Sequence, residues 1–125
     1  MTHYERLGGD PGIAALLEGL YLRGLADPLL APFLDNIDIA RLKAHQFAFL
    51  SQALGGPLQY SVPNLMQAHA RLPIEERHFD IFITHLRDTL KEIGAADDLV
   101  AEIMTQVTPL RSVIVNTPSG MRTAG

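Results

Sequence analysis

The sequence contains no cysteine, and this absence excludes disulfide bonds, zinc–thiolate sites and thiol-based catalysis. It also lacks a basic patch: its formal net charge is -4, which argues against nucleic acid as a partner. No apolar run approaches the length of a membrane span, and the opening "MTHYERLGGD" has no apolar core of the kind found in signal peptides. We therefore expect a cytoplasmic protein that binds neither nucleic acid nor membrane.

The composition is that of one folded domain. The chain has 125 residues, of which 47% are hydrophobic and 19% are charged, a balance typical of folded soluble proteins. There is no internal repeat and no convincing alternation of apolar and polar residues that would indicate strands. Apolar residues recur instead at helical spacing, so the predicted fold class is all-α. We place the domain at residues 1–116 and expect a flexible tail at 117–125.

Two long helices are predicted in the first half of the chain. Asp10 followed by Pro11 is typical of a helix start, and "ADP" at 26–28 ends that helix. Asp38 predicts the N-cap of a second helix from about 39 to 54, which Gly55-Gly56-Pro57 stops. The apolar positions of the first helix recur at the spacing of one face: Ile13, Leu16, Leu17, Leu20, Tyr21 and Gly24.

The second half predicts a short helix and a long one. Pro63 suits the start of the short helix, which carries His69 and ends at Pro73. From about 75 to 93 the apolar residues follow a 3.6-residue period, which predicts a long helix ended by Gly94.

A last helix is predicted near the end of the domain. Asp97 or Asp98 is expected to cap it, and Pro109 within it should bend it. The histidines outside these arguments are expected to hold no metal, because no carboxylate or third histidine completes a site: His78 and His85, with His3 solvated near the terminus.

The helix at 39–54 carries a glutamine inside its apolar stripe. With about 100° between successive residues, Phe49 falls near -20° and Gln46 near +40° from Leu42. An unpaired amide there would cost roughly 1–3 kcal/mol. The hydroxyl of Tyr21 lies on the inward face of the preceding helix. Either these two groups bond each other in the core or both point at a bound ligand, and periodicity leaves both readings open.

His69 is the other anomaly, since it lies on an apolar helix face between Leu65 and Leu72. An isolated histidine on such a face most often bonds a backbone carbonyl. Taken with Tyr21 and Gln46, however, it also fits a flat apolar cofactor with an axial metal site. Haem iron is commonly held by one histidine, while donors across the pocket decide how a gas ligand is treated.

Several segments, in order and without large gaps, resemble the first group of the truncated haemoglobins. They extend from about Tyr4 to Asn116: "YERLGG" (4–9), "LYLRGLADPLL" (20–30), "RLKAHQFAFLSQALGGP" (41–57), "LMQAH" (65–69) and "RHF" (77–79). The resemblance implies a two-over-two α-helical sandwich around a single haem b (iron protoporphyrin IX). It also implies dioxygen and other small gases as ligands.

The resemblance assigns roles to individual residues. It implies that His69 is the iron ligand and that Tyr21 and Gln46 are the distal donors. It further implies pocket residues on both sides of the haem: Leu42, Phe49 and Leu50 on the distal side, Leu65, Met66, Leu72 and Phe79 on the proximal side, and Arg41 near a propionate.

Two positions are left with alternatives. The family usually places a Phe-Phe pair after the second helix, and here the pair is Phe33-Leu34. Either Leu34 packs against the haem or the turn brings Phe33 in. His45 could be a sixth iron ligand, as in some relatives, or lie outside the pocket near a propionate.

Three functions follow. In the first, a monomeric haem protein binds dioxygen, nitric oxide or carbon monoxide reversibly, with Tyr21 and Gln46 stabilising the ligand. In the second, it converts nitric oxide to nitrate as a dioxygenase; this requires an external reductase, since no flavin or nicotinamide motif is present. In the third, it is a haem-free helical interaction domain in which Tyr21 and Gln46 merely pair. The first is the reading that we adopt.

Overall fold

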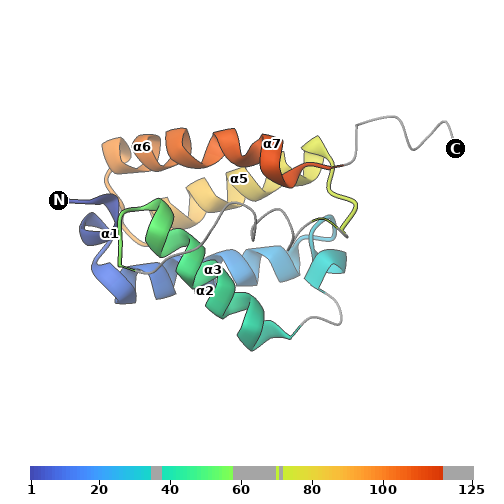
Figure 1. Cartoon of the computed structure of the whole chain (residues 1–125), viewed down its shortest axis with the longest axis horizontal. Helices are drawn as coiled ribbons and strands as arrows, with labels where there is room; N and C mark the ends of the chain where they lie inside the picture. Colours follow the sequence, from blue (N-terminus) through green and yellow to red (C-terminus); the bar gives the residue numbers. More distant parts are fainter. Residues whose placement is uncertain (35–37, 58–69, 71, 117–125) are drawn as a thin grey trace, which may run out of the picture.

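The computed structural model describes residues 1–34, 38–57, 70 and 72–116, and every regular element in these ranges is helical. The prediction of an all-α chain is therefore confirmed. No helix among these residues is long and apolar enough to span a membrane. The elements, shown in Figure 1, are α1 (His3–Arg6), α2 (Gly9–Ala26), η1 (Ala31–Leu34), α3 (Ile39–Ala53), α5 (Glu76–Glu92), α6 (Asp97–Val107), η2 (Thr108–Leu110) and α7 (Arg111–Ile114).

The four long helices form two pairs, one over the other (Figure 1). α5 and α6 run antiparallel to each other, and α2 packs against α5 on one side and against α3 on the other. α3 crosses α2 diagonally, whereas α2 and α5 lie nearly antiparallel to each other. α2 is therefore the central element, and residues of its two sides reach different partners.

The apolar core lies mainly between α2, α5 and α6. Burial of each large aliphatic side chain there contributes about 1.5–3 kcal/mol. α3 reaches this core with Leu50 and with Leu54 just beyond its end, whereas Leu42 and Gln46 in its first half lie outside the core. The buried members on these three helices are Ile13, Leu16, Leu17 and Leu20 of α2, Leu86 and Leu90 of α5, and Leu99, Val100, Ile103 and Val107 of α6.

The start of α2 differs from the prediction. The helix begins at Gly9 with Gly8 as its N-cap, so Asp10 is not the capping residue. Gly8 and Gly9 have φ angles of 102° and 69°, a region that glycine enters without steric cost, and the helix therefore starts two residues earlier than predicted. The Asp10 carboxylate instead accepts a hydrogen bond from the hydroxyl of Tyr4, which raises the pKa of that phenol.

α1 was not predicted, although its start carries a recognisable signal. The Thr2 hydroxyl accepts from the backbone N–H of Glu5, and the Glu5 carboxylate accepts from the N–H of Thr2, which makes a capping box. The Tyr4 N–H donates to the Leu54 carbonyl at 2.8 Å and ties α1 to the end of α3.

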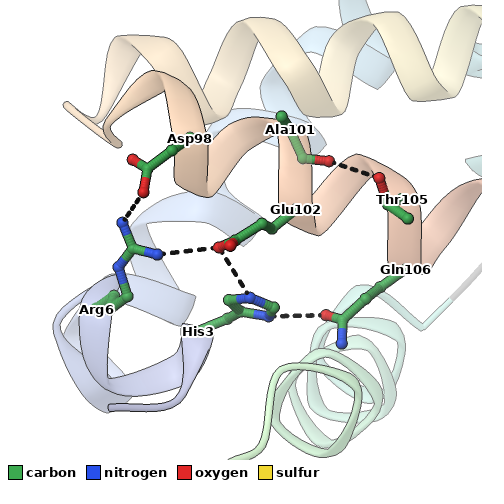
Figure 2. Close-up of polar contacts among 7 residues, drawn as sticks. All are labelled: His3, Arg6, Asp98, Ala101, Glu102, Thr105 and Gln106. Atoms are coloured by element: carbon green, nitrogen blue, oxygen red, sulfur yellow. Dashed lines mark hydrogen bonds and ion pairs between the residues drawn. The ribbon is translucent and has the colours of Figure 1, made fainter.

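Charged side chains hold α1 against α6 (Figure 2). Arg6 donates to Asp98 at 2.8 Å and to Glu102 at 3.0 Å, and these bonds raise the pKa of Arg6 and lower that of Asp98. His3 places Nε2 at 3.3 Å from Glu102 and Nδ1 at 2.9 Å from Gln106. The expectation that His3 is merely solvated is therefore wrong, because both ring nitrogens contact α6.

The remaining helix boundaries can be compared with the predicted N-caps and ends. Asp38 caps α3, as predicted, by accepting from the N–H of Arg41 at 3.2 Å, and α5 matches the helix predicted at 75–93 to within one residue at each end. The prediction for α6 is wrong in one respect. Ala96 is its N-cap, while Asp97 and Asp98 lie in the first turn, where their charges complement the helix dipole.

The helix predicted to contain Pro109 is interrupted around this residue. The helix that starts at Asp97 tightens into η2 at this residue and resumes as α7 at Arg111. A proline lacks the N–H that would continue the regular hydrogen-bond ladder, which accounts for the break.

α2 and α5 approach each other closely at Gly19, which has no side chain. A Cβ atom on Gly19 would lie 2.5 Å from Cγ2 of Thr89. Thr89 is completely buried, and its hydroxyl makes two hydrogen bonds. It donates to the His85 carbonyl at 2.7 Å and accepts from Arg23 at 3.0 Å. Arg23 also reaches Glu92 at 2.9 Å.

Candidate functional site

Tyr21 on α2 and Gln46 on α3 are polar residues at the junction between these helices. Both are half-buried, and neither belongs to the apolar core. Within the ranges that the structure describes, the Tyr21 hydroxyl and the Gln46 amide hydrogen-bond neither each other nor another residue. The reading in which the two groups simply pair is therefore not what the structure contains, and among the described residues neither group has a hydrogen-bond partner.

The ring of Tyr21 has a cation over one face. The ammonium of Lys43, from α3, lies 4.6 Å from the ring centroid. The same ammonium is 3.2 Å from a carboxylate oxygen of Glu18, which precedes Tyr21 by three residues on α2. These two charged side chains border an open groove between α2 and α3 with a volume of about 510 Å³. It is otherwise lined by Ala14, Leu17, Ala44 and Phe47.

The other distal residues predicted on α3 differ in burial. Leu50 is buried, whereas Leu42 and Phe49 are half-buried, so an apolar face continues from the core toward the first half of the helix. Arg41 and His45 are exposed. Their exposure fits side chains at the rim of a pocket better than side chains in its interior.

The Phe33-Leu34 pair lies in η1, between α2 and α5. The ring of Phe33 meets the buried imidazole of His78 edge-on, with centroids 4.8 Å apart and planes at 80°. Leu34 packs toward α2: its Cδ1 would be 3.4 Å from a Cβ placed on Gly24. Both members thus contact the protein, and which of them would stack on a haem stays a prediction.

His78 has the structural role expected of it. It is buried in the first turn of α5, where its Nδ1 accepts from the backbone N–H of Glu75 at 2.9 Å. This contact helps to close the start of α5, next to Phe79.

The predicted proximal residues that the structure describes are Phe79 and Leu72, of which the first is buried and the second half-buried. The guanidinium of Arg111 lies 4.8 Å from the centroid of the Phe79 ring. Arg111 also donates to Glu76 and, at 2.6 Å, to Asp80, and these carboxylates raise its pKa. α7 therefore covers one face of Phe79 and fastens the first turns of α5.

A second fastening lies just before α5. The N–H of Ile74 donates to the side-chain oxygen of Asn116, and the N–H of Asn116 donates to the carbonyl of Ile74, both at 3.0 Å. Ile74 is buried. The chain that leads from the predicted proximal segment into α5 is thus fixed by two hydrogen bonds, one that Ile74 donates and one that it accepts.

His69, Leu65 and Met66 lie outside the described residues, so their predicted roles are not tested by geometry. Among the residues that are described, no group of three or more histidine or acidic side chains could hold a metal ion.

One pairing near the site has no counterpart in the sequence argument. Nε2 of His85 lies 2.7 Å from the carboxylate of Asp27, and the two side chains are only 20% and 16% exposed. Asp27 also accepts from the N–H of Leu29 at 2.8 Å, and both hydrogen bonds lower the pKa of its carboxyl. The dipeptide Asp27-Pro28 indicates a turn, but a partner 58 residues away leaves no local signal.

Comparison with known proteins places this helical arrangement among haem proteins. The sequence profile described as "Bacterial-like globin" matches residues 2–116. The group 1 truncated hemoglobin GlbN of Mycolicibacterium paratuberculosis is 34% identical over 94% of this chain and 86% of its own length. That of Synechocystis is 37% identical over 82% of this chain and 86% of its own length. The crystal structure of truncated hemoglobin from Tetrahymena pyriformis, in its Fe(III) form, superposes with a TM-score of 0.86 at 32% identity, covering 94% of this chain and 100% of that one.

Proposed function

Because this chain belongs to the bacterial-like globins and, within them, to the group 1 truncated haemoglobins, we propose that it binds one haem b and takes up dioxygen and other diatomic gases reversibly. When bound, the haem would supply an iron centre that takes a histidine and a gas as ligands. In this chain His69 is the proposed histidine. Tyr21 and Gln46 are the proposed donors to the gas.

The observation that carries the proposal is the state of these two donors. Tyr21 and Gln46 lie on two packed helices, are half-buried and make no hydrogen bond among the described residues. Polar groups on packed helices that the described residues leave without a partner can hydrogen-bond a ligand, so this pair suits a ligand that accepts hydrogen bonds. The donor set therefore fits the gas side of a haem pocket.

The Tetrahymena pyriformis structures support the same pair. They include variants in which a tyrosine is replaced by phenylalanine and in which either of two glutamines is replaced by glutamate. The interval between the tyrosine and the second glutamine of that protein equals the interval between Tyr21 and Gln46. When the interval from that tyrosine to the first glutamine is counted from Tyr21 in this chain, it leads to Leu42. By this spacing, the two glutamine positions of that protein correspond to one glutamine, Gln46, and one leucine, Leu42, in this chain.

With a single amide, the phenol of Tyr21 becomes the principal donor. Its ring needs only two torsions to be fixed, so little side-chain entropy is lost when the hydroxyl donates. The amide N–H of Gln46 can donate to the phenol oxygen while the phenol O–H donates to the gas. A gas that carries partial negative charge when bound would accept a charge-assisted hydrogen bond of about 1.5–3 kcal/mol from Tyr21, which would slow its release about 10- to 150-fold.

The experiment has two stages. Purified protein titrated with haem is expected to develop a sharp Soret band; its absence would favour the haem-free interaction domain. In the haem-loaded protein, Tyr21→Phe is expected to speed dioxygen release at least tenfold in stopped flow, with a smaller effect for Gln46→Ala. Carbon monoxide is less polar in this setting, so its release should change much less and serves as the control. Unaltered dioxygen release in Tyr21→Phe would show that the phenol does not face the gas.

A further inference from the structure

Lys43 links the two helices that carry the proposed donors. It precedes Gln46 by three residues on α3, and its ammonium lies over the ring of Tyr21 on α2, 4.6 Å from the centroid. Glu18 holds the ammonium from α2 at 3.2 Å. Residues three apart on a helix share a face, so Glu18 and Tyr21 present a carboxylate and a ring side by side to the same cation.

The ion pair by itself explains little. The side chains of Lys43 and Glu18 are 37% and 58% exposed, and an ion pair so accessible to water contributes little to stability. The contact with the ring is different, because a cation over an aromatic face restricts how the ring can tilt. The positive charge over the ring also draws electron density away from the O–H bond, which makes the hydroxyl a stronger hydrogen-bond donor.

From this geometry we propose that Lys43 is a positioning residue for Tyr21: anchored by Glu18, it holds the phenol ring in place and strengthens the hydrogen bond that Tyr21 donates to a gas ligand. The inference rests on the proposed function. It adds a side chain that touches neither gas nor haem and acts only through Tyr21.

The alternative is that Lys43 only keeps the groove between α2 and α3 hydrated. A residue with that role could influence folding, but its effect on gas release would not depend on the Tyr21 hydroxyl. The two roles therefore differ in a double-mutant comparison.

The first measurement tests the contact itself. The chain has two lysines, Lys43 and Lys91, so the spectrum of lysine labelled with carbon-13 contains two sets of signals. Lys91 is exposed on α5 and is the internal control. In the carbon monoxide form of the haem-loaded protein, the ε-methylene protons of Lys43 are expected to be shifted upfield by the ring, and Tyr21→Leu should remove that shift. Equal shifts for both lysines, or a Lys43 shift that survives Tyr21→Leu, would overturn the proposal.

The second measurement tests the consequence. Lys43→Met is expected to speed dioxygen release about two- to fivefold, the range for losing one exposed cation–π contact. Lys43→Arg keeps a cation over the ring and should restore slow release, whereas Lys91→Met should match the parent. The infrared stretching band of carbon monoxide should move to higher frequency in Lys43→Met, because a weakened donor leaves the C–O bond stronger.

The decisive comparison is made in the Tyr21→Phe background, where Lys43→Met should have no further effect. An equal effect with and without the hydroxyl would overturn the positioning role. So would unchanged release in Lys43→Met when Tyr21→Phe alone is at least tenfold faster. If Tyr21→Phe itself changes nothing, the phenol does not face the gas, so the proposed donor role of Tyr21 fails and the role of Lys43 fails with it, a result distinct from the previous two.

Discussion

The carboxylate of Asp27 lies 2.7 Å from Nε2 of His85 and joins the end of α2 to the middle of α5. The same carboxylate accepts from the N–H of Leu29, so it also shapes the turn that follows α2. That turn leads into η1, which carries Phe33 and Leu34. The pairing therefore sets where the chain departs from α2 on its way to the site.

Replacing Asp27 by Asn should lower the free energy of unfolding at pH 7 by about 1–2 kcal/mol. The reason is that a hydrogen bond to a charged group is lost between two side chains that are mostly buried. The folded-state pKa of Asp27 is lowered from its ordinary value of 3.8. Its contribution is therefore fully present above pH 3.8 and is lost as the pH falls through the folded pKa. Urea unfolding at pH 7 and at successively lower pH should show the gap between parent and variant closing. Asp88→Asn, an exposed site on α5, is the control; a gap independent of pH would contradict the argument.

Gly19→Ala should destabilise the fold by about 1–3 kcal/mol, because the new Cβ would lie 2.5 Å from Cγ2 of Thr89. Thr89 cannot easily turn away, as its hydroxyl is bonded on both sides. Gly24→Ala on the same helix is the matched control: its Cβ would meet only the flexible end of Leu34, at 3.4 Å. That change should be neutral or stabilising by up to about 1 kcal/mol. Equal thermal shifts in the two variants would refute the steric account.

His69→Ala should abolish stable haem incorporation, or leave a cavity in which added imidazole restores it. The reason is that no other proximal ligand is proposed, and the second ring nitrogen of His69 is expected to donate to a backbone carbonyl of its own helix. Absorption spectra with and without imidazole decide the matter. A variant with the parent spectrum would show that His69 does not hold the iron.

For His45 we predict a mixed resting state, in which part of the haem-loaded protein has this imidazole as the sixth iron ligand. The side chain is exposed on α3, so coordination would require the backbone to move and should be incomplete. Low-spin features in the unliganded protein that vanish in His45→Ala would establish it. A purely high-spin ferric spectrum in the parent would argue the opposite.

The helices could be predicted because their signals are local. The apolar period of α2, the cap at Asp38 and the proline at Pro109 each act within a few residues, and the structure confirms them. Tyr21 and Gln46 were noticed because each interrupts an apolar face.

Contacts between distant helices could not be predicted in the same way. The pairing of Asp27 with His85 and the position of Lys43 over Tyr21 depend on how helices cross, which no periodicity encodes. α1 is a different case, since the capping box of Thr2 and Glu5 is legible but the helix is only four residues long. The start of α2 was misplaced because Gly8 turns the chain before Asp10 can cap it.

The pair of hydrogen bonds between Asn116 and Ile74 determines where this protein can be shortened. A chain cut after Val115 would leave both main-chain groups of the buried Ile74 without these partners, at the entrance to α5. A chain cut after Asn116 keeps both, and the match to the family profile ends at that same residue. Affinity tags and fusion partners at the carboxyl end should accordingly be joined beyond Asn116, and linker design should treat that asparagine as part of the folded unit.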